Sequence, residues 1–130
     1  MKRYVVEQGT DQVERLLREE PAATCRLSEA EISAALARRC RAGELDDANR
    51  AAALGRLRAD LVRLQVVEIG PAVVSRVHGL LDRHPLRARD VLQLAAAIAL
   101  REGAGVEVEF VGFDDRLNTA ARTEGFSVRP

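Results

Sequence analysis

The most constraining feature of the sequence is a helical segment at 87–101 that is almost wholly apolar after Asp90. A helix that is apolar on every side cannot face water, and it is typical of the centre of a folded domain. Its apolar part, residues 91–100, is too short to cross a lipid bilayer, which needs about 20 residues. The sequence therefore predicts a domain built around this helix, with no membrane-spanning segment.

Strand-like and helix-like segments alternate along the rest of the chain. Short apolar stretches predict strands at 22–27, 66–69, 108–113 and 126–128, and helical spacing of apolar residues predicts helices near 10–20, 28–41, 46–64, 71–83 and 114–123. Such alternation is typical of an α/β fold with a mainly parallel sheet that helices cover. With 130 residues the chain is expected to be a single domain, residues 1–130.

Charge and cysteine content narrow the class of protein. Lys plus Arg and Asp plus Glu are equal at 20 each, which argues against a protein that coats nucleic acid, because such proteins are basic. The balance still permits an enzyme that holds RNA locally, through metal ions and an edge of arginines. Cys25 and Cys40 lack metal-ligand spacing, and no signal peptide is visible, so we expect reduced thiols and a cytoplasmic location.

Three carboxylates occupy positions where a parallel sheet would gather them. Glu31 lies in the first turn of the helix after the 22–27 strand, Asp90 at the polar start of the apolar helix, and Asp114 where the 108–113 strand ends. Ligands of open α/β sheets bind beyond the carboxyl ends of the strands, so we expect all three at one edge. Hard oxygen ligands suit Mg²⁺ or Mn²⁺, which can activate water for phosphodiester cleavage.

Each of these residues also has a purely structural interpretation. Glu31 can close a capping box with Ser28, and Asp114 can cap the helix that follows it. Asp90 is harder to explain as a cap, because a buried acid needs a partner. His78 and His84 are interpreted as structural residues near helix ends.

Four segments together resemble the PIN-domain family, specifically the VapC-type toxin ribonucleases. Residues 86–97 resemble the stretch with the family's third acid, residues 110–117 its fourth-acid strand, residues 28–36 its second-acid helix, and residues 2–7 the end of its first helix. The resemblance implies a PIN-like three-layer sandwich and a bacterial Mg²⁺- or Mn²⁺-dependent endoribonuclease. Such toxins act on RNA, bind a small antitoxin protein and commonly form homodimers. By the same match, Glu31, Asp90 and Asp114 are the catalytic, metal-binding acids, and Asp115 is a further metal ligand.

The match also shows departures from the family pattern. The family's first strand and the Asp that ends it would precede Met1, so we expect them to be missing from this chain. A missing central strand would leave backbone groups unpaired, at about 1–3 kcal/mol each. The chain is therefore expected to be a shortened reading of a longer gene, less stable and nearly inactive. Gly112 stands where the family often has Ser or Thr, and Gln93 where it often has His.

Two other functions remain open from the sequence alone. The chain could be a catalytically impaired PIN-like protein that only binds an antitoxin or another protein. It could also be an α/β interaction domain whose acids are only helix caps. Metal titration separates the nuclease from the interaction domain, and RNA cleavage separates it from the impaired binder.

Overall fold

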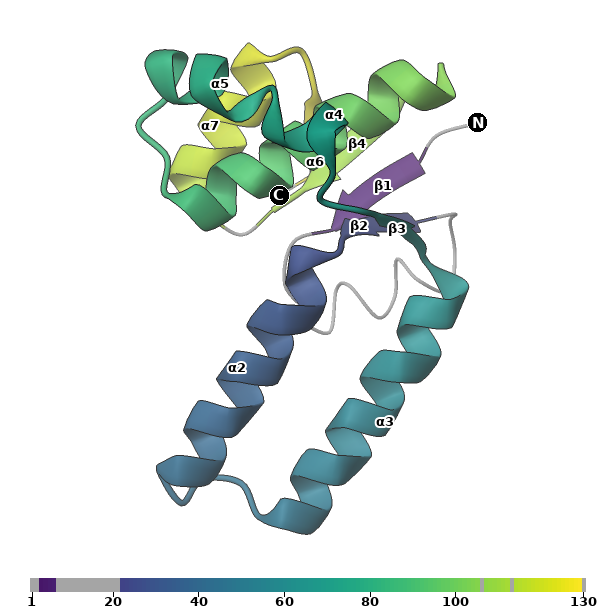
Figure 1. The fold of residues 1–130 in the computed structure, drawn as a ribbon, viewed down its shortest axis with the longest axis vertical. Helices are drawn as coiled ribbons and strands as arrows, with labels where there is room; N and C mark the ends of the chain where they lie inside the picture. The colour runs from purple at the N-terminus through teal and green to yellow at the C-terminus, as the bar shows by residue number, and fades with distance from the viewer. Residues whose placement is uncertain (1–2, 7–21, 106, 113, 130) are drawn as a thin grey trace.

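The computed structural model describes residues 3–6, 22–105, 107–112 and 114–129. Its strands are β1 (Arg3–Val6), β2 (Ala22–Cys25), β3 (Gln65–Val67), β4 (Val108–Val111) and β5 (Ser127–Arg129). Its helices are α2 (Leu27–Arg41), α3 (Asp47–Arg63), α4 (Pro71–Val74), α5 (Val77–Arg83), α6 (Ala88–Ala104) and α7 (Asp115–Thr123). The expected α/β fold with a parallel sheet and covering helices is confirmed (Figure 1). The helix expected near 10–20 lies outside the described residues.

The described strands form one sheet in the order β3-β2-β1-β4-β5, and every pairing among them is parallel. β1 therefore lies at the centre, paired with β2 on one side and β4 on the other. Because the strands are parallel, the carboxyl ends of β1, β2 and β4 point to the same edge of the sheet. This edge carries the segments that lead into α2 and α7.

The position of β1 corrects one prediction from the sequence. Residues 2–7 were expected to end a helix, and the central strand was expected to be missing; both expectations are wrong, because Arg3–Val6 is the central strand. The sequence Tyr-Val-Val has high strand propensity. Its pairing on both sides also gives hydrogen-bond partners to backbone N–H and C=O groups of β2 and β4, which would be costly to leave unpaired in the interior.

Helix α6 is the centre of the core, as its composition predicts. Val91, Leu94 and three successive alanines at 95–97 are inaccessible to solvent. The helix contacts β2 and β4 of the sheet, and α4 and α5 pack on it (Figure 1). The ring of Phe110 in β4 and the ring of Phe126, directly before β5, lie 6.0 Å apart between centroids. None of the helices within the described ranges has the length and apolar character needed to span a membrane.

Helices α2 and α3 form an antiparallel hairpin that projects away from the sheet (Figure 1). Ser28 is the one residue of α2 that is fully buried, and α3 has none. Asp46 caps α3 by accepting a hydrogen bond of 2.7 Å from the backbone N–H of Asn49. The two helices contact each other, and their apolar residues are half-buried. The apolar face of the hairpin is therefore partly exposed to solvent.

Two local predictions about helices are wrong. The helix expected at 71–83 is divided into α4 and α5 at Ser75 and Arg76. The capping box of Ser28 and Glu31 does not form, because α2 begins at Leu27 and has no side-chain cap. Ser28 is instead buried inside α2, where its hydroxyl bonds to other side chains.

Candidate metal and nucleic-acid site

Three aspartates share one hollow at the carboxyl edge of the sheet. Asp90 is in the first turn of α6, Asp114 is the N-cap of α7 after β4, and Asp115 is the first residue of α7. The hollow has a volume of about 480 Å³, and its other lining residues are Pro85, Arg87, Arg89 and Arg116. Of the three carboxylates expected at one edge, the structure brings Asp90 and Asp114 together here, with Asp115 beside them. We call this hollow the acid hollow.

Asp90 has the environment expected of a cation ligand. The residue is 8% exposed, and its carboxylate accepts no hydrogen bond from the described residues. Its nearest cationic atom is Nε of the adjacent Arg89, 3.9 Å from Oδ1. A nearly buried carboxylate without a close partner is costly, and a bound cation would remove that cost. The oxygen atoms of Asp90 are thus available within the acid hollow.

Asp114 both caps a helix and lines the acid hollow. Its Oδ1 accepts a hydrogen bond of 2.9 Å from the backbone N–H of Leu117, which confirms the predicted N-cap. The buried amide of Asn118 donates to the carbonyl oxygen of Gly112 at 3.1 Å and so braces the turn between β4 and α7. Capping therefore uses Oδ1 and orients the carboxylate, while Oδ2 stays available.

Glu31 is connected to α6 through a buried polar network. Nε2 of Gln93 donates to Oε1 of Glu31 at 3.0 Å and to the hydroxyl of Ser28 at 3.1 Å. The hydroxyl of Thr24, at the end of β2, donates to the same Ser28 oxygen at 2.9 Å. Gln93 is 1% exposed and lies three residues after Asp90, so the network holds Glu31 beside the helix that carries Asp90.

Glu31 is nevertheless not part of the acid hollow. It is absent from the lining of the hollow, and the described residues contain no group of three or more His, Cys, Asp or Glu side chains that could hold a metal ion. The aspartates of the hollow offer the hard oxygen atoms that Mg²⁺ and Mn²⁺ prefer. The donor chemistry therefore fits such an ion, with Asp90 and Asp114 as the best-placed ligands. The sequence residue directly after β1, Glu7, lies outside the described residues.

The arginines of the acid hollow were not named from the sequence. Arg87 is the N-cap of α6, Arg89 lies in its first turn, and Arg116 lies in the first turn of α7. The positive end of the helix dipole makes the first turn an unfavourable place for a cation. Basic residues in the first turn of two predicted helices, or directly before it, were thus the signal in the sequence that pointed to an anionic ligand.

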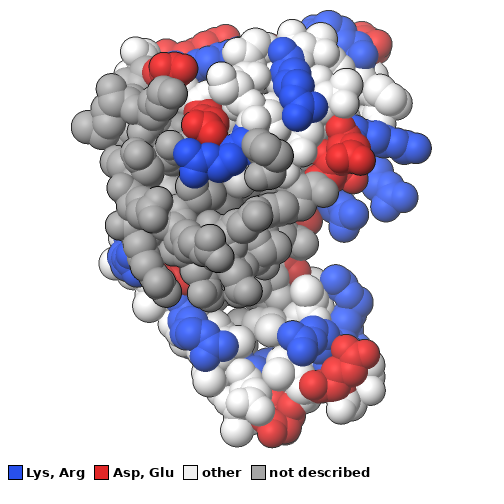
Figure 2. All heavy atoms as spheres, turned by 180° about the vertical axis from the view of Figure 1, so that it is seen from behind, with Lys and Arg blue, Asp and Glu red and all other residues white. Residues whose placement is uncertain are grey.

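Charge on the described part of the face seen in Figure 2 is mixed. On the face seen in Figure 2, basic and acidic side chains alternate over the described residues, and neither sign forms a continuous field. This agrees with the formal net charge of zero. General attraction for a polyanion is therefore weak, and local groups must provide it.

A second cluster, next to the acid hollow, has a structural role. The carboxylate of Glu124 accepts bonds of 3.1 Å from both Nε and Nη2 of Arg83, and it lies 2.7 Å from Nε2 of the buried His84. The bonds from Arg83, with a smaller contribution from His84, hold the pKa of Glu124 below its usual range despite partial burial. The cluster fastens the end of α5 to the end of α7, which agrees with the structural interpretation of His84. His78 pairs with Asp82 on the surface.

Comparison with known proteins agrees with the fold. The model of the PIN domain family matches residues 6–122. No curated protein matches the chain.

Solved structures give the same result. The chain resembles PAE2754 from Pyrobaculum aerophilum, with 21% identity, a TM-score of 0.68, and 97% of this chain and 82% of that one covered. It resembles VapBC2 from Rickettsia felis bound to a promoter DNA fragment, with 14% identity, a TM-score of 0.63, and 99% and 98% covered. It also resembles a toxin–antitoxin complex from Klebsiella pneumoniae, with 17% identity, a TM-score of 0.55, and 82% and 75% covered. At these identities the solved structures support the fold alone.

Proposed function

Because the chain belongs to the PIN domain family, we propose that it is a metal-dependent endoribonuclease that hydrolyses RNA phosphodiester bonds. The observation that carries this proposal is the acid hollow, where Asp90, Asp114 and Asp115 meet at the carboxyl edge of the sheet. Asp90 supports it most strongly, because its nearly buried carboxylate accepts no hydrogen bond from the described residues.

Asp90 and Asp114 would hold Mg²⁺ or Mn²⁺, with Asp115 as a further ligand. Glu31 does not line the acid hollow, and it would act from beside it, on the α2 side, where the amide of Gln93 holds it. A bound ion of this kind supplies an activated water and stabilises the charge that develops on the phosphate. The hydrogen bond from the backbone N–H of Leu117 to Asp114 fixes the orientation of that carboxylate before substrate binds.

The arginines of the acid hollow would bind the RNA backbone. Arg87 and Arg116 have no carboxylate partner among the described residues, so their charges are free to meet phosphates. A chain with zero net charge has little long-range attraction for RNA. Binding should therefore depend on these local charges and on bound metal, and it should weaken as salt rises.

A small antitoxin protein is the second partner that we propose. Two structural neighbours are described as VapBC2 and as a toxin–antitoxin complex. The hairpin of α2 and α3 offers a partly exposed apolar face on which an amphipathic segment could pack. We also propose a homodimer and a cytoplasmic location for the toxin.

Cleavage of RNA tests the proposal. The purified chain is incubated with a fluorescently labelled single-stranded RNA, with Mg²⁺, with Mn²⁺ or with chelator. Asp90→Asn and Asp114→Asn should abolish metal-dependent cleavage, whereas Asp82→Asn, an exposed acid on α5 outside the acid hollow, should not. Cleavage that survives Asp90→Asn, or that proceeds in chelator, would contradict the proposal. Folded protein that binds an antitoxin but never cleaves would favour the impaired binder.

A further inference from the structure

We propose that a second hollow beside the acid hollow receives the base of one RNA nucleotide, and that Arg116 holds the adjoining phosphate. This inference rests on the proposed function, since it assigns a subsite for the same substrate. The second hollow has a volume of about 230 Å³ and is lined by His84, Pro85, Asp115, Arg116, Thr119 and Ala120. We call it the base hollow.

The base hollow adjoins the acid hollow, with which it shares part of its lining. Pro85, Asp115 and Arg116 line both, so a ligand that enters one can extend into the other. A nucleotide has this shape, with a flat base on one side and a charged phosphate on the other. Sequence-dependent recognition of single-stranded RNA places unstacked bases against flat side chains or arginine planes.

The lining of the base hollow suits a flat, largely apolar group. The ring of Pro85 and the side chains of Ala120 and Thr119 provide apolar surface. His84 adds an imidazole whose position is fixed by its contact of 2.7 Å with Glu124. A base that enters the hollow would therefore meet a surface that is already ordered, so little conformational entropy is lost on binding.

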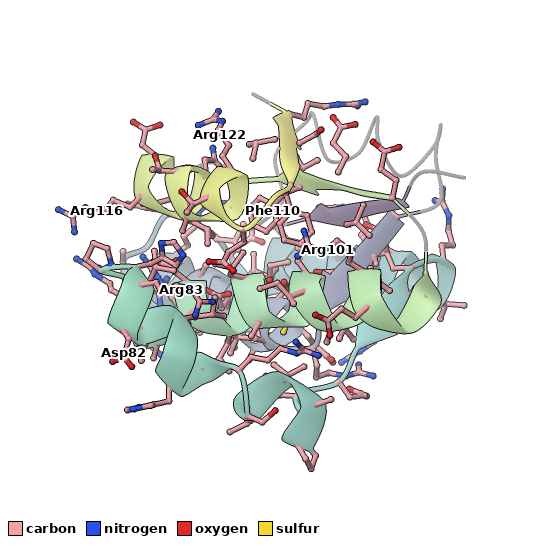
Figure 3. All side chains as sticks on the ribbon, turned by 90° about the horizontal axis from the view of Figure 1, so that it is seen from above. Asp82, Arg83, Arg101, Phe110, Arg116 and Arg122 are labelled. Carbon is pink, nitrogen blue, oxygen red and sulfur yellow. The ribbon has the colours of Figure 1, made fainter. Side chains whose placement is uncertain are left out.

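Arg116 has the charge and the freedom that a phosphate ligand requires. It is exposed and forms no ion pair with a described residue, whereas Arg83 is held by Glu124 in a two-pronged pair. It extends from the first turn of α7 away from the rest of the molecule, while Arg122 near the other end of the helix points in a different direction (Figure 3). A cation beside the positive end of a helix is unfavourable unless it meets an anion.

An acidic peptide is the alternative ligand, but the two adjoining hollows favour RNA. A carboxylate-bearing side chain could meet Arg116, but it has no flat ring to fill the base hollow. A nucleotide satisfies both hollows at once. The two ligands are separated by experiment.

The base hollow is tested by filling it without disturbing the acid hollow. Thr119 and Thr123 are both exposed on α7, and each hydroxyl donates to the carbonyl four residues before it, at 2.9 Å and 3.0 Å. Thr119→Leu and Thr123→Leu therefore lose the same kind of hydrogen bond, but only Thr119 lines the base hollow. The readout is binding of a fluorescein-labelled RNA hexamer in chelator at low salt, with and without an abasic site.

Thr119→Leu should weaken binding of the intact hexamer roughly tenfold, the effect of losing one stacked base. It should also remove the difference between intact and abasic RNA, whereas Thr123→Leu should leave both unchanged. Equal effects of the two variants would overturn the base hollow, as would the absence of any RNA binding by the intact chain. Preferential binding of a polyglutamate peptide, sensitive to Thr119→Leu, would also overturn it.

Arg116 is tested against Arg122 on the same helix. Arg116→Ala should weaken binding of both RNAs and lower the slope of log affinity against log salt by about one, and Arg122→Ala should not. An unchanged slope for Arg116→Ala would overturn its role at the phosphate. Because these measurements use chelator, they are independent of cleavage: a chain that never cleaves can still show the base hollow, and an active nuclease can lack it.

Discussion

Replacing Gln93 by Glu tests whether Glu31 lies against the helix that carries Asp90. The amide of Gln93 is 1% exposed, and its Nε2 lies 3.0 Å from Oε1 of Glu31. The substitution keeps the shape of the side chain but can place a second anionic oxygen at that distance. At an effective dielectric constant near 20, two charges at this separation repel by roughly 5 kcal/mol. Glu31 is only half-buried and can turn toward water, so we expect a net loss of about 3–5 kcal/mol in the free energy of unfolding at pH 7.

The loss should depend on pH with a defined sign. The new carboxyl group is buried beside an acid, so its pKa in the folded chain lies above the value of about 4.3 in the unfolded chain. The folded chain then binds more protons above that pH, and the destabilisation grows as pH rises. As pH falls to about 4, the stability of the variant should approach that of the unmodified chain.

Urea unfolding of Gln93→Glu at pH 7 and at pH 5 measures both effects. Gln65→Glu is the matched control, because Gln65 is exposed on β3 and should change stability by less than about 0.5 kcal/mol. Two results would refute the reasoning. One is a Gln93→Glu variant as stable as the Gln65→Glu control at pH 7, and the other is a loss that does not diminish at lower pH.

Three further predictions concern the structure around the site. Glu124→Gln should lower the urea midpoint at neutral pH, and the difference from the unmodified chain should disappear in acid. The pKa of Glu124 is lowered in the folded chain, so its carboxylate stabilises the fold above its unfolded pKa and loses this effect as pH falls through its folded pKa. A difference in midpoint that is constant with pH would contradict this. Phe110→Ala should cost about 3–5 kcal/mol in urea unfolding, because the ring is inaccessible to solvent, and a loss below about 1 kcal/mol would contradict its place in the core. Burial, and to a smaller extent the charges of nearby acids, raises the pKa of the Cys25 thiol. A thiol reagent near pH 8 should therefore modify the half-buried Cys40 before Cys25. Equal rates of modification at the two cysteines would be inconsistent with the structure.

Much of the fold could be predicted from local patterns. The apolar character of 91–100, interrupted only by Gln93, identified α6 as the central helix, because a helix that is apolar on nearly every side must be buried. Asp114 was predicted as an N-cap because a short polar side chain before a helical pattern satisfies a free N–H group. These features depend on residues close together in the chain.

The predictions that failed depend on distant parts of the chain. Arg3–Val6 forms the central strand because β2 and β4 offer pairing partners on both sides, and four residues alone do not reveal that. Ser28 was predicted to cap a helix, but the hydroxyl of Thr24 and the amide of Gln93 bring it into a buried network. Hydrogen bonds formed in the folded chain thus determined the position of Ser28, although the local sequence favoured a helix cap.

The candidate site shows the same division. Glu31, Asp90 and Asp114 were expected at one edge of the parallel sheet, and of these Asp90 and Asp114 line one hollow together with Asp115, whereas Glu31 does not line it. The link from Glu31 to Gln93 spans 62 residues and could not be read from spacing. The assignment of all these acids to a metal remains a prediction.

Titration of the chain with Mn²⁺ in a calorimeter tests the central claim, that the acid hollow holds a catalytic divalent cation, most directly. The account predicts saturable binding by the unmodified chain, the same binding by Asp82→Asn, and a loss of roughly tenfold or more in affinity for Asp90→Asn. It also predicts that Asp90→Asn is at least as stable as the unmodified chain without metal, because a nearly buried carboxylate is gone whose ion pair with Arg89 is long, at 3.9 Å. Equal Mn²⁺ affinity in Asp90→Asn and Asp82→Asn, or no Mn²⁺ binding by the unmodified chain, would contradict the account.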